Sequence, residues 1–335
     1  MQDTTPLLSV RDLSIDFHLR THILHAVRGV SFDLHKGRTL ALVGESGSGK
    51  SVTARALLRI VDAQARVAGG TITLDGPSGP QRLDFMAPGS REIRAIRGRR
   101  IGLIFQEPMS SLSPVHTIGA QIMEALRLHR RMTKAEAKAE TVELLRQVEI
   151  KEPAKMADRY TFEFSGGMRQ RAMIAMALAC DPDVLIADEP TTALDVTTQA
   201  EIMDLTRRLQ ADRGMAMLLI THDLGLVAET ADEVAVMRWG RIVEQGPVDR
   251  VFHAPRMPYT RDLLSATMRL EAGRVHAAPD PLGPLVLSVR GLTKGFGATN
   301  WRGRQTWAIT AVDSVDLDLR RGENLGIVGE SGSGK

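Results

Sequence analysis

Short apolar runs alternate with segments of helical spacing over most of the first two-thirds of the chain. The runs at Leu40–Val43, Val184–Ala187 and Met217–Ile220 are short and continuous, as in strands buried on both faces. Helical spacing follows at Ser51–Ile60, and Met173–Ala179 is small and apolar like a buried helix. Strands that alternate with helices predict an α/β core with a mostly parallel sheet.

Two segments depart from this alternation. Residues Leu7–Leu34 and Gly70–Leu74 alternate between polar and apolar positions, which is typical of antiparallel strands. The middle, about Pro114–Glu163, has no strand pattern and is rich in helical spacing. Thr133 and Glu136 form a capping-box pattern that opens a helix there, with Leu144, Leu145 and Val148 on one face. We expect an antiparallel β subdomain and a helical insertion, at about residues 114–163, in the α/β core.

The beginning of this pattern occurs a second time. The heptapeptide GESGSGK stands at Gly44–Lys50 and again at Gly329–Lys335, and Ser9-Val10-Arg11 returns as Ser288-Val289-Arg290. The segment 271–284 between the copies holds three prolines and two glycines, which is typical of a linker. We therefore expect one whole domain at residues 1–270, a linker at 271–284, and the truncated beginning of a second domain at 285–335.

Composition and charge restrict the class of protein, but they say little about its chemistry. The length of 335 residues is typical of about two domains, and the 43% hydrophobic and 25% charged contents are those of a soluble globular protein. No apolar run is long enough to span a bilayer, and no secretory signal pattern is present. The single cysteine, Cys180, excludes an intramolecular disulfide, which fits a cytosolic location. The net charge of +3 and the one short basic stretch, Arg91–Arg100, do not indicate nucleic-acid binding; a solvated helix-to-strand connection explains that stretch.

The first heptapeptide copy carries the clearest chemistry. With Ser51 it completes the pattern G-x-x-x-x-G-K-S of a phosphate-binding loop, between a strand and a helix. Glycines let the backbone N–H groups wrap around phosphates, Lys50 reaches the β- and γ-phosphates, and the Ser51 hydroxyl is a Mg²⁺ ligand. The predicted nucleotide-binding residues of this loop are Gly44, Glu45, Ser46, Gly47, Ser48, Gly49, Lys50 and Ser51.

Two adjacent acids follow a buried strand in the segment Asp183–Pro190. A strand that delivers Asp188 to the carboxyl edge of the sheet can place it on Mg²⁺. Successive strand residues face opposite sides, so Glu189 points elsewhere and is a candidate to polarise the attacking water. A surface acidic pair is the alternative, which the phosphate-binding loop makes weak.

These motifs together resemble the ATP-binding cassette (ABC) ATPases, over about residues 7–265 with a restart at about 285. Phe164–Gln170, FSGGMRQ, resembles the signature motif of that family, with Ser165, Gly166 and Gly167 as a second phosphate-binding helix start. The other matching residues are Gln106 of the Q-loop, Asp195 of the D-loop, the switch histidine His222, and Phe17 at the position of the aromatic residue that stacks on adenine. A lone phenylalanine at a strand end is otherwise more often a core residue.

The resemblance implies a P-loop ATPase with half of each nucleotide site on each of two cassettes. Glu189, His222 and Gln106 would be catalytic, and Mg²⁺ would be held by Ser51, Asp188 and Gln106 while ATP is bound. The signature of a second cassette would complete the site, and this cassette comes either from a second copy of the chain or from the missing remainder of its own repeat. Lys335 is followed by neither a hydroxyl residue nor a helix, so the sequence contains one complete half-site and the beginning of another.

The segments EFSGGMRQR, ALDVTTQA and Pro258–Arg261 resemble the oligopeptide, dipeptide and nickel importer ATPases, including fused two-cassette members of the glutathione-importer type. This implies membrane-spanning permease subunits, indirectly a solute-binding protein, and a peripheral place on the cytoplasmic face of the inner membrane. A groove in the helical insertion would receive a permease helix. Because no cysteine follows Cys180, we expect no iron–sulfur cluster, and Cys180 itself is predicted to be a buried small hydrophobe.

Two other interpretations stay open at this point. One is a non-transport ABC ATPase, such as a component of a phosphonate-metabolism complex. The other is an inactive truncated fragment, because 51 residues at 285–335 are few for an independent domain and would leave strand edges unpaired. The transported solute is not encoded in this chain, since selectivity would lie in other subunits.

Overall fold

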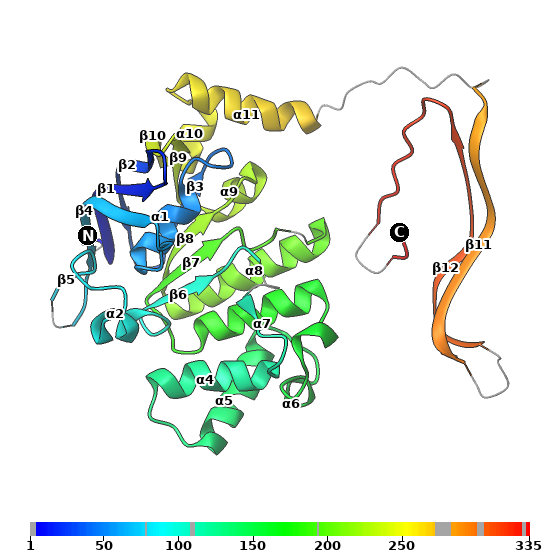
Figure 1. Cartoon of the computed structure of the whole chain (residues 1–335), viewed down its shortest axis with the longest axis horizontal. Helices are drawn as coiled ribbons and strands as arrows, with labels where there is room; N and C mark the ends of the chain where they lie inside the picture. Colours follow the sequence, from blue (N-terminus) through cyan, green and yellow to red (C-terminus); the bar gives the residue numbers. More distant parts are fainter. Residues whose placement is uncertain are drawn as a thin grey trace. The chain divides into compact units, whose positions relative to one another are not determined.

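The computed structural model describes residues 5–77, 79–107, 111–192, 194–271, 283–299, 305–329 and 333–335. Contacts divide the chain into two units: residues 1–193 with 200–271, and residues 194–199 with 272–335. The predicted linker at 271–284 lies almost wholly outside the described residues. The large unit contains two sheets and a group of helices, and the small unit contains a two-stranded hairpin (Figure 1).

The central sheet of the large unit has six strands in the order β10-β9-β3-β8-β7-β6. These strands are β3 (Thr39–Val43), β6 (Ile101–Ile104), β7 (Val184–Asp188), β8 (Ala216–Ile220), β9 (Glu233–Arg238) and β10 (Arg241–Pro247). The strands from β9 to β6 pair in parallel, whereas β10 is antiparallel to β9. Every residue of β3, β7 and β8 is buried, which confirms the prediction of central parallel strands from three continuous apolar runs.

The second sheet is antiparallel and has the order β2-β1-β4-β5. Its strands are β1 (Leu8–His18), β2 (Ile23–Leu34), β4 (Ala65–Leu74) and β5 (Gln81–Arg82). The apolar side chains on one face of β1, such as Leu8, Leu13 and Ile15, are fully buried in a core that also includes residues of β7 and β8. The antiparallel pairing confirms the prediction from the alternating pattern, and the structure adds that one apolar face is buried.

The described residues up to 271 contain ten α-helices and one 3₁₀ turn. They are α1 (Lys50–Leu57), α2 (Arg91–Ile96), α4 (Ile118–His129), α5 (Lys134–Gln147), α6 (Pro153–Met156), the 3₁₀ turn η1 (Thr161–Glu163), α7 (Gly166–Leu178), α8 (Val196–Arg213), α9 (Leu224–Thr230), α10 (Val248–His253) and α11 (Pro258–Glu271). Among these described residues, no helix is both long and apolar enough to cross a membrane.

The helices α4 to α7 lie between β6 and β7 in the sequence, where the strand pattern is absent. Figure 1 shows them grouped below these strands, away from the antiparallel sheet. The predicted capping box opens α5: the Glu136 backbone N–H donates to the Thr133 hydroxyl, and the Glu136 carboxylate accepts from the Thr133 backbone N–H. Leu144, Leu145 and Val148 are buried as the helical spacing indicated.

The end of the large unit is held by one buried carboxylate on β10. Glu244 accepts hydrogen bonds from the backbone N–H groups of Arg256 at 3.0 Å and Met257 at 3.1 Å, and from the Arg250 guanidinium at 3.0 Å. Burial opposes ionisation of Glu244, but these donors outweigh it and lower its pKa to about 2. A single ionised side chain thereby connects β10, α10 and the start of α11.

The small unit is built around the antiparallel pair β11 (Leu285–Thr299) and β12 (Gln305–Arg320). Among residues 283–297, 309–329 and 333–335, none is buried. The segment Leu325–Val328, which repeats the sequence position of β3, is not part of a strand. Residues 330–332 of the second heptapeptide lie outside the described residues.

Candidate active site

The first heptapeptide forms a tight loop between β3 and α1 that requires glycine at two places. A Cβ atom on Gly44 would lie 2.1 Å from the Met237 carbonyl oxygen, and Gly44 has a φ of +149°. A Cβ on Gly49 would lie 2.7 Å from the Ala26 oxygen, and the φ of Gly49 is +104°. Neighbouring strands therefore pack directly against this backbone, and any side chain at either position would displace the loop.

The loop presents hydrogen-bond donors that a bound anion would satisfy. The N-cap of α1 is Gly49, which has no side chain to satisfy the first N–H groups of the helix. The Ser48 hydroxyl is buried and has no hydrogen-bond partner. A phosphate placed at the start of α1 would satisfy these groups, so the residues present fit the predicted phosphate-binding role.

Lys50 is buried at the first position of α1. Its ammonium group donates to the carbonyl oxygens of Gly44 at 2.7 Å and Glu45 at 2.9 Å. Burial lowers the pKa of Lys50, whereas the nearby carboxylates of Glu189 and Asp188 raise it. A buried ammonium held against its own loop is in position to exchange these carbonyl contacts for phosphate oxygens.

Ser51 and Asp188 meet although 137 residues separate them in the sequence: the Ser51 hydroxyl donates to Asp188 Oδ1 at 2.8 Å. Burial raises the pKa of Asp188, and the hydrogen bond from Ser51 opposes this. Hydroxyl and carboxylate oxygens are hard ligands suited to Mg²⁺, and a cation would relieve the burial cost of the Asp188 charge. Within the described residues there is no cluster of three or more acidic, histidine or cysteine side chains that could bind a metal by itself, so a cation here would also need phosphate or water ligands.

Glu189 follows β7 in the left-handed region, with a φ of +48°. Its carboxylate accepts a hydrogen bond from the Gln106 amide at 2.9 Å and one from the Thr192 hydroxyl at 3.0 Å. The His222 Nδ1 atom lies 3.6 Å from the other carboxylate oxygen of Glu189. One neighbouring residue, Thr192, and two residues distant in sequence, Gln106 and His222, thus surround one carboxylate, which is the arrangement expected of a water-polarising base.

The predicted residues differ in how they take part in this group. Gln106 contacts Glu189, so its predicted role as a Mg²⁺ ligand beside Ser51 and Asp188 stays a prediction. The His222 side chain is 67% exposed and lies between the end of β8 and the start of α9. Sequence reasoning missed Thr192; the available signal was a hydroxyl residue three positions after Glu189, within reach of its carboxylate.

The signature residues form a separate helix start. The Ser165 hydroxyl accepts the Met168 backbone N–H at 3.3 Å as the N-cap of α7. Ser165 and Gly166 are exposed, and α7 packs against α4, α5 and β6. On this chain the signature therefore faces solvent, and its predicted contribution to a nucleotide site needs another cassette.

The two remaining predicted residues have local structural roles. Phe17 is half-buried in β1, opposite Leu24 of β2 and Ala65 of β4, and packs against the main core. This placement accounts for Phe17 as a core residue, and its stacking on adenine stays a prediction. The Asp195 carboxylate accepts the Thr198 backbone N–H at 2.9 Å and caps the start of α8.

The phosphate-binding loop also contacts the C-terminal part of the large unit, which sequence reasoning did not foresee. The Gly240 N–H donates to the Ser48 carbonyl oxygen at 3.0 Å, and the Glu45 N–H donates to the Tyr259 hydroxyl at 3.4 Å. The Arg238 guanidinium lies 4.4 Å from the centre of the Tyr259 ring. The Pro258–Arg261 segment, noted only as a family feature, thus helps to support the loop.

Comparison with known proteins agrees with this geometry. Residues 27–192 match the ABC transporter family, and residues 243–283 match the oligopeptide/dipeptide transporter C-terminal region. A peptidoglycan transport ATP-binding protein of Agrobacterium fabrum is 50% identical over 335 residues, which are 99% of this chain and 60% of that protein. A glutathione import ATP-binding protein of Salmonella choleraesuis is 46% identical over 357 aligned positions, covering 99% of this chain and 57% of that protein. The chain thus spans about three-fifths of the length of these curated relatives.

Solved structures support the same assignment. The dimeric post-hydrolysis state of the ATP-binding cassette MJ0796, bound to ADP and Pi, matches with a TM-score of 0.64 and 25% identity, over 72% of this chain and 98% of that one. The cbiO1 protein of Clostridium perfringens, part of an ABC transporter complex, matches with a TM-score of 0.62 and 26% identity, over 80% of this chain and 99% of that one. The chain belongs to the ABC transporter ATPases and has the P-loop ABC cassette fold with an oligopeptide/dipeptide-type C-terminal region.

Proposed function

We propose that this chain binds and hydrolyses ATP with Mg²⁺ and supplies the energy for an importer of peptides or related small solutes. The observation that carries the proposal is the position of Glu189. Its carboxylate is oriented by Gln106 and Thr192 and lies close to His222. It is also near the phosphate-binding loop, because its charge raises the pKa of Lys50. An oriented carboxylate of this kind is suited to activate water for attack on a phosphoryl group, and ATP binding alone would not require it.

Each residue has a defined task in this reaction. The loop N–H groups and Lys50 bind the phosphates, and Ser51 with Asp188 would hold Mg²⁺, which neutralises phosphate charge when bound. Glu189 accepts a hydrogen bond from the attacking water and takes its proton, while Gln106 and Thr192 hold the carboxylate in place. His222, exposed at the edge of this group, is available to contact the terminal phosphate.

The site would be completed by the Ser165–Gly167 signature of a second cassette. Support comes from the exposed position of Ser165 and Gly166 and from the similarity to a cassette solved as a dimer. We further propose that residues 1–270 are one cassette, that 271–284 link it to the next, and that 285–335 are the beginning of a second. The greater length of the curated relatives agrees with this division.

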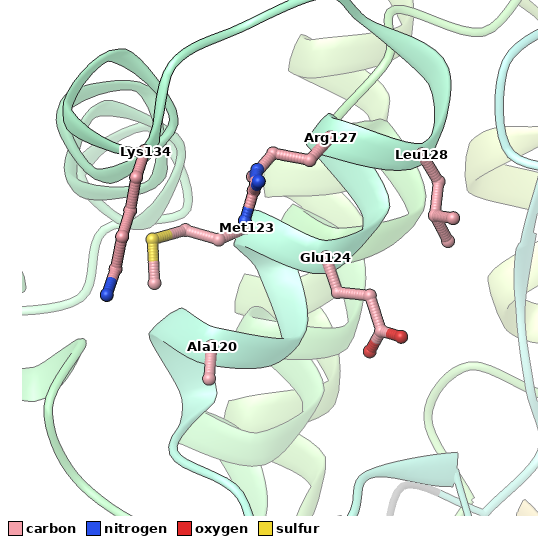
Figure 2. A pocket seen from close by; sticks show the side chains of 6 residues that line it. All are labelled: Ala120, Met123, Glu124, Arg127, Leu128 and Lys134. Atoms are coloured by element: carbon pink, nitrogen blue, oxygen red, sulfur yellow. The ribbon is translucent and has the colours of Figure 1, made fainter.

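A hollow on α4 is suited to a permease helix. It has a volume of about 390 Å³ and is lined by Ala120, Met123, Glu124, Arg127, Leu128 and Lys134. Figure 2 shows the first five along α4, with Lys134 extending from the start of α5. An apolar floor with a charged rim fits an amphipathic helix. Since α4 follows the Gln106 loop in sequence, docking there could be transmitted to Glu189.

The permease partner places the chain at the cytoplasmic face of the inner membrane as a peripheral subunit. A peptide-type solute is supported by the matching C-terminal region and by the relatives, which are described as peptidoglycan transport and glutathione import proteins. A solute-binding protein would deliver this solute to the permease, and nucleic acid is not among the proposed partners.

The substitution Glu189→Gln tests the proposal. We expect ATP affinity to stay within about twofold of wild type and steady-state phosphate release to fall by at least about 100-fold. Glu201→Gln is the matched control, because Glu201 is exposed and pairs only with Arg171 in the described structure, at 3.2 Å. Phosphate release by Glu189→Gln within tenfold of wild type would contradict the assignment of Glu189.

A further inference from the structure

A second hollow lies beside the first and is strongly basic. Its volume is about 640 Å³. The side chains that define this basic hollow are those of Arg91, Arg94, Arg97 and Arg99 around α2, and Leu128 and His129 at the end of α4. No aspartate or glutamate lines it. None of its residues belongs to the phosphate-binding loop, the signature or the Glu189 group.

The four arginines lack acidic partners, unlike the arginines next to them. Arg100 pairs with Asp183 at 2.5 Å, and Arg130 pairs with Asp181. Among the described residues, none of Arg91, Arg94, Arg97 and Arg99 has a carboxylate within 4.0 Å. The nearest acid in sequence, Glu92, has its pKa lowered by hydrogen bonds from its own backbone N–H and from Ser90, and also by the charge of Arg91, but Glu92 does not line the hollow.

The positive charges around the hollow are partly buried and repel one another, which costs free energy. A bound anion would reduce this cost. Arg97 is fixed by donating to the carbonyl oxygens of Leu58 at 2.8 Å and Arg59 at 3.0 Å. Burial lowers the pKa of Arg97, and the positive charges of Arg59 and Arg94 lower it further. The pKa of His129 is likewise lowered, first by burial and then by the charge of Arg99. Clustered cations without counter-charges are typical of anion sites.

We propose that the basic hollow binds a phosphate-bearing anion. One guanidinium group can donate two parallel hydrogen bonds to two oxygens of a phosphate. This geometry suits phosphate better than a single ammonium group does. Arg97, held by backbone carbonyls, gives the site a fixed member, while the exposed Arg91, Arg94 and Arg99 can close around the ligand. The phosphate could come from a soluble polyphosphate or from a phospholipid headgroup, since the exposed Leu128 at the border offers an apolar contact.

The test uses the full chain carrying Lys50→Ala, which disables the phosphate-binding loop. One arm titrates inorganic tripolyphosphate by calorimetry. The other measures co-sedimentation with vesicles of phosphatidylcholine that contain phosphatidylglycerol, against pure phosphatidylcholine. We expect binding in one arm, which identifies the source, and an affinity loss of at least about tenfold in the triple variant Arg91→Gln, Arg94→Gln, Arg99→Gln.

A charge-matched control separates the site from general attraction. The triple variant Arg20→Gln, Arg241→Gln, Arg261→Gln removes the same charge from exposed positions elsewhere and is expected to bind normally. The triple variant Arg91→Lys, Arg94→Lys, Arg99→Lys keeps the charge and is expected to bind with intermediate affinity. Absence of binding in both arms, an equal loss in the two glutamine variants, or equally strong binding of tetraglutamate would overturn the proposal.

Discussion

The hairpin β1–β2 and the hairpin β11–β12 have the same backbone pairing in different surroundings. Ser9 pairs with Asp33 as Ser288 pairs with Asp318, and Leu13 pairs with Val30 as Leu292 pairs with Val315. Even the irregularities agree: Asp12 and Gly291 share a positive φ, of 49° and 57°. The local sequence is therefore sufficient to specify strand pairing and bulges.

The two hairpins differ in burial, which the local sequence does not determine. Leu13 is fully buried, whereas its counterpart Leu292 is 47% exposed. The first hairpin pairs with β4 and packs on a core that includes β7 and β8, both far along the chain. The second has no buried residue among residues 285–297 and 309–320. A hairpin needs such neighbours before its apolar face contributes to stability.

The same contrast separates β3 from its repeat. Thr39–Val43 is a fully buried strand between β8 and β9, whereas Leu325–Val328 is not a strand and its Val328 side chain is 97% exposed. Parallel strands depend on partners that are distant in sequence. The second copy of the pattern therefore reproduces the hairpin and does not reproduce the strand that leads into the phosphate-binding loop.

The largest expected effect comes from removing equivalent leucines in the two hairpins. Leu13→Ala deletes a fully buried side chain and should lower the free energy of unfolding by about 3 kcal/mol. Leu292→Ala should change it by less than about 0.5 kcal/mol, because the site is open to solvent. Urea denaturation of both variants measures the difference, and equal destabilisation would show that the second hairpin is buried in solution.

A smaller effect is expected from Asp188, one of two acids, with Glu244, that are buried in the described part of the large unit. Burial raises the pKa of Asp188, so its ionised form destabilises the fold at neutral pH, and this penalty is lost as pH falls from the raised pKa to the ordinary value of 3.8. Asp188→Asn should raise the free energy of unfolding at pH 7 by about 1 kcal/mol and abolish the Mg²⁺ dependence of ATP binding. A variant that is less stable than wild type at pH 7 would indicate that the Asp188 charge is compensated without a metal.

The smallest effect concerns an exposed ion pair in the second hairpin. Hydrogen bonds from Arg290 and Ser288 lower the pKa of Asp318 to about 2, from an ordinary value of 3.8. A lowered pKa means that the stabilisation is present above pH 3.8 and is lost as pH falls towards 2. Arg290→Ala should return the pKa of Asp318 towards its ordinary value, measured by NMR titration of the carboxyl carbon. An unchanged low value would show that Arg290 is not the partner in solution.

Much of this architecture could be predicted from the sequence, because the relevant signals are local. Apolar runs indicated β3, β7 and β8, and Thr133 with Glu136 indicated the start of α5. The P-loop pattern and the position of Asp188 after a strand indicated that Ser51 and Asp188 belong to one site. What could not be predicted are contacts fixed by the packing of distant segments. Tyr259 against the loop and Gln106 on the Glu189 carboxylate are of this kind. Thr192 is different, because it lies only three residues after Glu189 and its local spacing was an available signal.

The central claim is that the chain has one nucleotide-binding half-site, formed around Lys50. Lys50 is buried at the start of α1 and donates to Gly44, whereas Lys335 is exposed and donates to Gly329. Calorimetric titration with a non-hydrolysable ATP analogue and Mg²⁺ tests the claim directly, on wild type, Lys50→Ala and Lys335→Ala. The account predicts one site per chain, lost in Lys50→Ala and unchanged in Lys335→Ala. Two sites per chain, or loss of binding in Lys335→Ala, would contradict it.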